Sequence, residues 1–95
     1  MMELAEFQDL MRRTYLERDS ARGQDAVLRW LVEEVGEVAR AMRHSDRAAL
    51  THELGDVLAW LTSLANVLGI DLAEAAGRYA DGCPKCGSIP CACPV

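Results

Sequence analysis

Five carboxylates lie in two short stretches of the sequence, and their spacing is helical. The first stretch contains Glu33, Glu34 and Glu37, and the second contains Glu53 and Asp56. Residues three apart on an α-helix point to one side, so Glu34 pairs with Glu37 and Glu53 pairs with Asp56. Clustered carboxylate oxygens are ligands that hard divalent cations prefer, so we expect a site for Mg²⁺ or Mn²⁺.

The apolar residues around these acids favour a metal site over an ordinary charged surface. On the first helix Glu34 lies at the edge of an apolar arc, and on the second helix Glu53 falls inside one. The arcs are Val27, Leu31, Val35, Val38 and Met42, and then Leu50, Val57, Leu61, Leu64 and Leu68. Carboxylates are rarely buried unless they are paired or bind a metal, and no Lys or Arg lies one turn from Glu53. A solvated acidic face is the alternative, and it suits Glu33, which points further from the arc.

A second candidate site lies in residues 82–95, which hold all four cysteines and all three prolines. The order Cys83-Pro84-Lys85-Cys86-Gly87 is typical of a zinc knuckle, and Cys91 and Cys93 complete a four-sulfur ligand set with a tighter spacing than usual. A flexible tail with free thiols and a redox or disulfide function are the alternatives. A zinc ion here would be structural.

Other side chains could contact a bound molecule. Trp30 and Trp60 each lie one turn from an acid and could form a wall against a flat base, or they could belong to the core. Arg18 and Arg22 fall in a polar stretch, predicted to be the first loop, and could bind phosphate or remain solvated. Asn66 could hydrogen-bond a base or sugar, although an outward-facing polar residue is the simpler account.

The hydrophobic periodicity predicts helices that would hold these residues. The expected helices cover about residues 2–18, 24–43, 46–68 and 71–80, with caps at Ser45-Asp46, Gly69 and Asp71. No strand pattern is present. We therefore expect an all-α, antiparallel four-helix bundle-like protomer, with a helical domain over residues 1–81 and a short Cys-rich tail over 82–95. His44 and His52 lie near the turn between the second and third predicted helices, and we expect both to be exposed.

Composition narrows the class of protein. A hydrophobic content of 51% argues against disorder, and a net charge of −5 argues against binding to nucleic acid. The chain has only 95 residues, so its core would be marginal and self-association would help. No signal peptide is recognised, and no apolar stretch approaches the ~20 residues that would cross a membrane. These features predict a cytoplasmic protein with no membrane partner.

Taken together, the pattern Glu33-Glu34-x-x-Glu37 followed by Glu53-x-x-Asp56 resembles the signature of the MazG-like all-α nucleoside triphosphate pyrophosphohydrolases. The similarity extends over about residues 4–80. It implies Mg²⁺-dependent hydrolysis of a nucleoside triphosphate to the monophosphate and pyrophosphate, including house-cleaning of non-canonical nucleotides. It also implies that the four paired acids are metal ligands, and that Glu33 is an outer ligand or orients the attacking water.

The resemblance carries two further implications. Members form homodimers or homotetramers with substrate bound between protomers, and a basic residue near the fourth helix reaches the phosphates; here Arg78 is the candidate. A di-metal oxidase is set aside, because such sites need a glutamate three residues before each histidine. Here alanines, Ala41 and Ala49, lie three residues before His44 and His52. The remaining alternative is a non-enzymatic helical interaction module with a zinc-binding tail.

Overall fold

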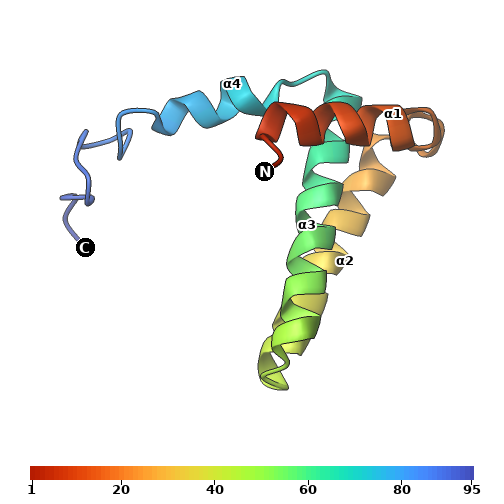
Figure 1. Cartoon of the computed structure of the whole chain (residues 1–95), viewed down its shortest axis with the longest axis horizontal. Coiled ribbons are helices and arrows are strands. Elements are labelled where there is room, and N and C mark those ends of the chain that lie inside the picture. Colours follow the sequence, from red (N-terminus) through yellow and green to blue (C-terminus); the bar gives the residue numbers. More distant parts are fainter.

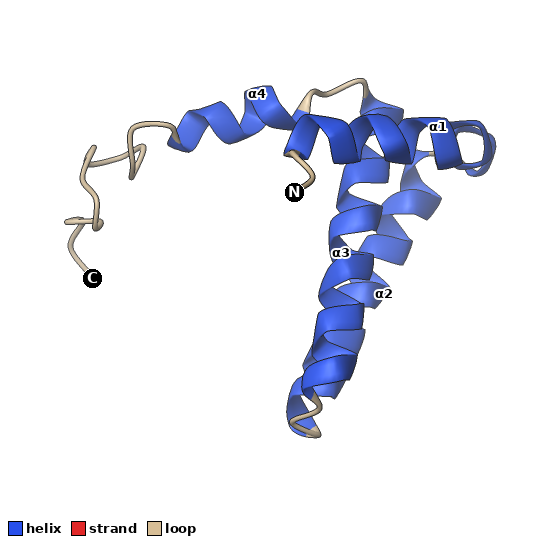
Figure 2. Cartoon of the chain, in the orientation of Figure 1, coloured by secondary structure: helices blue, strands red, loops and turns tan.

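The structure is a computed structural model that describes all 95 residues, Met1–Val95, and it contains four α-helices and no strand (Figures 1 and 2). The helices are α1 (Leu4–Arg22), α2 (Gln24–Arg43), α3 (Arg47–Leu68) and α4 (Leu72–Ala76), and a 3₁₀ turn, Gly77–Tyr79, follows α4. The all-α fold class with a Cys-rich tail is confirmed.

α2 and α3 form a helical hairpin, and α1 crosses one end of it. α2 and α3 run antiparallel and pack along their length, and α1 lies across the end where α2 begins and α3 finishes (Figure 1). α4 and the tail extend away from this body (Figure 2). The α2–α3 hairpin therefore determines how the five acids are placed relative to one another.

Local capping explains why these helices begin and end where they do. The Asp46 carboxylate accepts a hydrogen bond from the Ala49 backbone N–H at 3.1 Å, and Asp71 accepts one from that of Ala73 at 2.9 Å. Gly69 ends α3 in the left-handed conformation, with φ of 71°. These caps agree with those predicted for the third and fourth helices.

The fourth α-helix was predicted to reach about residue 80 but ends at Ala76, and the first loop was predicted wrongly. Residues 18–22 continue α1, and the only break before α2 is Gly23, whose φ of 91° few other residues adopt. Asp19 is only 2% exposed, and its Oδ1 atom lies 3.5 Å from Nε of Arg22. This pairing across one turn stabilises helix where the polar composition suggested a loop.

The seam between α2 and α3 differs from the expected apolar arc. Its residues on α2 are Val27, Leu31, Glu34, Val38 and Ala41, which are buried or half-buried. Glu34 thus lies within the seam and not at its edge. Val35 and Met42, which were placed on the same apolar arc as Val27, are instead 53% and 63% exposed in the isolated chain.

Each hairpin helix carries a second apolar stripe that nothing in the chain covers. The stripes have identical spacing: Leu28, Val32, Val35 and Met42 on α2, and Leu54, Leu58, Leu61 and Leu68 on α3, all more than 40% exposed. Leu61 and Leu68, which were placed on the apolar arc of the second acidic helix, belong to this set. On α3 the corresponding half-buried seam residues are Glu53, Val57, Trp60 and Val67. On both helices each stripe residue directly follows a seam residue, so the stripe is rotated from the seam by roughly 100° about the helix axis. Because the helices are antiparallel, these rotations bring both stripes to one side of the hairpin.

The fully buried core of a single chain is correspondingly small. Only three apolar residues, Val27, Ala41 and Ala65, are buried. Four polar residues, Gln8, Asp19, Thr62 and Ser63, are buried with them. Hydrogen bonding therefore contributes much of the specific packing where α1 crosses the hairpin.

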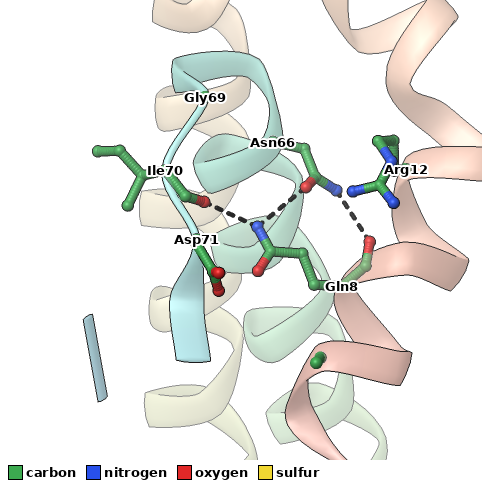
Figure 3. Close-up of a pocket in the computed structure, with 7 residues that line it drawn as sticks. Gln8, Arg12, Asn66, Gly69, Ile70 and Asp71 are labelled. Atoms are coloured by element: carbon green, nitrogen blue, oxygen red, sulfur yellow. Dashed lines mark hydrogen bonds between the residues drawn. The ribbon is translucent and has the colours of Figure 1, made fainter. Parts of the chain in front are cut away.

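Gln8 joins three elements at that crossing (Figure 3). Its side-chain amide donates to Oδ1 of Asn66 at 3.0 Å and to the Ile70 carbonyl at 2.8 Å. Its Oε1 also accepts a hydrogen bond from the Leu72 backbone N–H at 2.8 Å. Asn66 returns a hydrogen bond to the Gln8 carbonyl at 3.2 Å. This network fixes the start of α4 relative to α1 and the end of α3.

No single helix is long and apolar enough to cross a membrane. α3 and the segment Leu72–Tyr79 pass that test only when taken together, and they are bent by 111° at the break between them.

Candidate active site

The hairpin brings acids from both helices together near its middle. Ligand atoms of His52, Glu53 and Asp56 on α3 all lie within 4.8 Å of one another. Glu34 faces them from α2, and its Oε2 atom is buried with no hydrogen-bond partner. A buried carboxylate oxygen without a donor is costly unless a cation or a proton satisfies it.

The electrostatics of Glu34 reflect this environment. Burial raises its pKa, and the adjacent carboxyl group of Glu53 and the charges of Asp56 and Glu37 raise it further. The same four carboxylates supply only oxygen ligands, so they suit Mg²⁺ or Mn²⁺ better than a softer ion. The residues present therefore fit the divalent ion that the sequence pattern implies.

The remaining predicted acids have different surroundings. Glu37 is half-buried and close enough for its charge to act on Glu34. Glu33 is exposed and lines a shallow surface depression with Ala26, Arg29 and Trp30. Four acids thus form one cluster within the chain, and Glu33 lies outside it.

His52 lies beside the four acids, next to Glu53 and Asp56, and the sequence analysis did not select it as a site residue. It is exposed, as expected, but its Nε2 atom lies 3.3 Å from Oδ2 of Asp56. The signal was available, because the two residues are four apart on one helix. When its imidazole is protonated, a histidine at this distance can form an ion pair with Asp56 and hold its carboxylate in place.

A hollow of about 290 Å³ opens beside the acids, in the corner between α1 and the hairpin. Asp56 belongs both to the acid cluster and to the wall of this hollow. The other lining residues include Tyr15, Arg18, Arg22, Trp30 and Trp60. Both arginines of the supposed loop therefore face the site from a helix.

The two tryptophans form one aromatic surface in the hollow. Their ring centroids are 5.6 Å apart and the ring planes differ by 10°, so the indoles are stacked. The Arg22 guanidinium lies over the Trp60 ring, 5.4 Å from its centroid. The hollow thus combines flat apolar surface and positive charge next to a negatively charged cluster.

Two predicted substrate contacts lie elsewhere in the chain. Asn66 does not face outward or toward the acids, because its amide is engaged with Gln8 at the crossing of α1 and α3 (Figure 3). Arg78 lies in the turn after α4, with its guanidinium 5.9 Å from the centroid of the Tyr79 ring. In the single chain neither residue lines the hollow.

The four cysteines converge as a separate group in the tail. Their sulfur atoms all lie within 4.8 Å of one another, and all four thiols are free. Backbone amides face two of them, since the N–H of Ala92 lies 3.3 Å from Sγ of Cys86 and that of Cys93 lies 3.4 Å from Sγ of Cys91. The Ala92 amide, followed by that of Ser88, lowers the pKa of Cys86 to about 6. This Cys₄ cluster could bind zinc.

The fold and the acid cluster define an all-α protein with a carboxylate-rich site between two antiparallel helices. The family model described as the MazG nucleotide pyrophosphohydrolase domain matches residues 22–84, more than half of the chain. The chain belongs to this family, whose members generally use a divalent metal and act on nucleotides. The match takes in the complete hairpin and α4 but leaves almost all of α1 outside, although α1 supplies one wall of the hollow.

The charge on Glu34 can be tested without measuring activity. We expect Glu34→Gln to raise the melting midpoint of metal-free protein at pH 7, because it removes repulsion in the seam; each kcal/mol corresponds to about 4–8 °C in a domain of this size. A raised carboxyl pKa stabilises the folded state below the ordinary value of 4.5, and that contribution is lost as the pH rises. The difference between variant and wild type should therefore shrink as pH falls toward 4.5.

With Mg²⁺ present, the wild type should become more stable than Glu34→Gln, the reverse of the order expected without metal. At about 100 times Kd the ion would stabilise the wild type by ~2.7 kcal/mol, and Glu34→Gln should lose most of this gain. Glu6→Gln, which removes an exposed acid of α1, is the control and should respond as the wild type does. An equal Mg²⁺-dependent shift in Glu34→Gln and wild type would contradict a role for Glu34 in ion binding.

Proposed function

We propose that this protein is an Mg²⁺-dependent nucleoside triphosphate pyrophosphohydrolase that converts a (d)NTP and water to the (d)NMP and pyrophosphate. The observation that carries the proposal is the buried, unpartnered Oε2 of Glu34, which faces Glu53 and Asp56 across the seam. An inert acidic surface would leave that oxygen in water. Membership of the MazG family supports the same reaction class.

In this proposal Glu34, Glu37, Glu53 and Asp56 hold the divalent ions. The ions, when bound, would offset the roughly four negative charges of a triphosphate, activate water and stabilise the departing pyrophosphate. His52 would keep the Asp56 carboxylate oriented through their contact of 3.3 Å. Manganese, which accepts the same oxygen ligands, is expected to substitute.

The residues must also handle one proton. As the oxygen of water bonds to the α-phosphorus, the bond from that phosphorus to the bridging oxygen breaks, and its electron pair leaves with pyrophosphate. Glu34 would be occupied by an ion in the reacting complex, so we assign the proton released by water to Glu33, which does not belong to the ion-binding set. Glu33 is proposed to orient that water from the exposed side of α2.

The hollow beside Asp56 is proposed to bind the nucleotide. Its arginines, Arg18 and Arg22, can make paired hydrogen bonds to phosphate oxygens, and the stacked Trp30 and Trp60 offer a surface to the base. A non-canonical base would be accepted as readily as a normal one by stacking alone. Arg78 is retained as a phosphate contact only if it reaches the hollow of another protomer.

A second copy of the chain is the proposed occupant of the uncovered apolar side of the hairpin. The two matching stripes lie on one side, and the isolated chain buries only three apolar residues. Packing two hairpins by these stripes would give each dimer the four long helices that a bundle core needs. A homodimer is the smallest assembly that satisfies this requirement, and a homotetramer would contain two such dimers.

The reaction is tested with a panel of normal, oxidised and deaminated (d)NTPs, scored for pyrophosphate against phosphate. At least one member should release pyrophosphate only with Mg²⁺ or Mn²⁺, and Glu53→Gln or Asp56→Asn should reduce kcat by at least ~100-fold with the helical content retained. Glu6→Gln is the matched surface control and should keep wild-type turnover. No metal-dependent turnover across the panel would favour the non-enzymatic helical module instead.

The hollow is tested through binding and through KM. The only two tryptophans both line it, so an analogue with a methylene group between its α and β phosphates should change intrinsic fluorescence on binding. Arg18→Ala should raise both the Kd for this analogue and KM by about tenfold, which corresponds to one charged hydrogen bond of ~1.4 kcal/mol. Arg47→Ala, at the far end of the hairpin, should change neither. Equal values for the two variants would place the phosphates elsewhere.

The oligomer is tested by light scattering after size-exclusion chromatography. Wild type should have at least twice the 10.4 kDa mass of one chain. Leu58→Glu, which puts a charge in the apolar stripe, should shift the mass toward the monomer, whereas Leu4→Glu on α1 should not. A monomeric wild type at tens of micromolar would contradict the assignment of the stripes to a second copy.

A further inference from the structure

We propose that Cys83, Cys86, Cys91 and Cys93 bind one zinc ion as a tetrathiolate site, and that this ion holds the fold of the tail after α4. The site is independent of the carboxylate cluster and of the proposed hydrolase activity. Three observations support the proposal: the separations of the sulfur atoms, the backbone conformation around the cysteines, and the lack of another packing core in the tail.

The sulfur positions match the ligand shell of zinc. Sγ of Cys83 lies 3.6 Å from both Cys91 and Cys93, and Sγ of Cys86 lies 4.0 Å from Cys91. Zinc–sulfur bonds of about 2.3 Å in a tetrahedron place sulfur atoms about 3.8 Å apart. The observed separations lie on either side of this value, so one ion fits between the four thiolates without rearranging the backbone.

The backbone around the first pair of cysteines is folded as a turn that presents sulfur inward. Gly87 N–H donates to the Cys83 carbonyl at 2.7 Å, and Gly87 has φ of 74°, a conformation that favours glycine. Gly82 has φ of 100°, and a Cβ atom there would lie 2.5 Å from the Ile89 side chain. Both glycines that flank this pair are thus required by the folded tail.

The second pair is also arranged for thiolates. Amides of Ala92 and Cys93 face the sulfurs of Cys86 and Cys91. Amide donors stabilise negative sulfur, and four thiolates so close together would repel one another without a cation between them. Sulfur-only tetrahedral sites select zinc or iron. Zinc is chosen here because it needs no redox partner, and iron is left as an outcome of the test.

Nothing else in the tail supplies enough packing to keep it folded. Beyond Tyr79 it contains no helix or strand, and its largest apolar side chain, Ile89, is 81% exposed. Segments this short and exposed do not normally hold one conformation unless a metal or a disulfide joins them, and the thiols here are free. Metal binding and folding of the tail should therefore occur together.

The chain contains a built-in reporter for this folding. Lys85 is its only lysine, and it lies between the first two cysteines. A lysine-specific endoprotease can therefore cut the whole chain at one peptide bond, inside the proposed site. Bound zinc should slow this cleavage because the protease needs an extended, accessible segment.

The experiment uses the full chain purified under reducing conditions without added zinc. Elemental analysis should find about one zinc per chain. Removing it with a strong chelator should speed cleavage at Lys85 by at least ~10-fold, and added zinc should restore protection while helical circular dichroism stays constant. Co²⁺ in place of zinc should give the intense sulfur-to-metal absorption of a thiolate site.

Variants decide between a metal site and a tail folded by other means. Cys86→Ser and Cys93→Ser should each lose zinc on dialysis and be cleaved as fast as the chelated wild type, whereas Ser88→Ala, which keeps all four thiols, should behave as the zinc-bound protein. No bound metal with four titratable thiols, or cleavage at Lys85 that zinc does not affect, would overturn the proposal. Iron with its visible absorption, or disulfides found by mass, would overturn the assignment to zinc.

Discussion

Repulsion among carboxylates in the seam of the α2–α3 hairpin is the constraint on which the rest of the structure depends. A hairpin of this length could be held by apolar residues alone, yet Glu34 and Glu53 occupy positions that pack toward the opposite helix. Such a seam is less stable than an apolar one until a cation enters it. The protein thus gives up folding stability at the point where we propose that it binds a cation.

That loss explains why contacts outside the seam matter. α1 packs across one end of the hairpin through buried polar residues, and the uncovered apolar stripes remain available for a second copy. Both sources of stability leave the acid cluster open on its own side. The apolar stripes lie about 100° round each helix from the seam. The surface that we propose binds a second copy is therefore separate from the acid cluster that we propose performs the reaction.

Much of this arrangement could be predicted from sequence because its signals are local. The i,i+3 pairing of acids, the caps at Asp46, Gly69 and Asp71, and the grouping of cysteines each depend on neighbouring residues. What escaped prediction depends on tertiary contacts. Asn66 was misplaced because its partner, Gln8, lies 58 residues away in the chain, and the extra turn of α1 depends on the burial of Asp19.

The network around Gln8 has a consequence for how the chain can be divided. Gln8 of α1 is hydrogen-bonded both to residues at the C-terminal end of α3 and to the start of α4. The N-terminal helix therefore sets the direction in which α4 and the cysteine tail leave the hairpin. A fragment cut to the limits of the family match, residues 22–84, would keep all five acids of the two motifs but lose almost all of α1 and three of the four cysteines. In that fragment Gln8 would no longer hold the start of α4, and the hollow would lack the wall that α1 supplies.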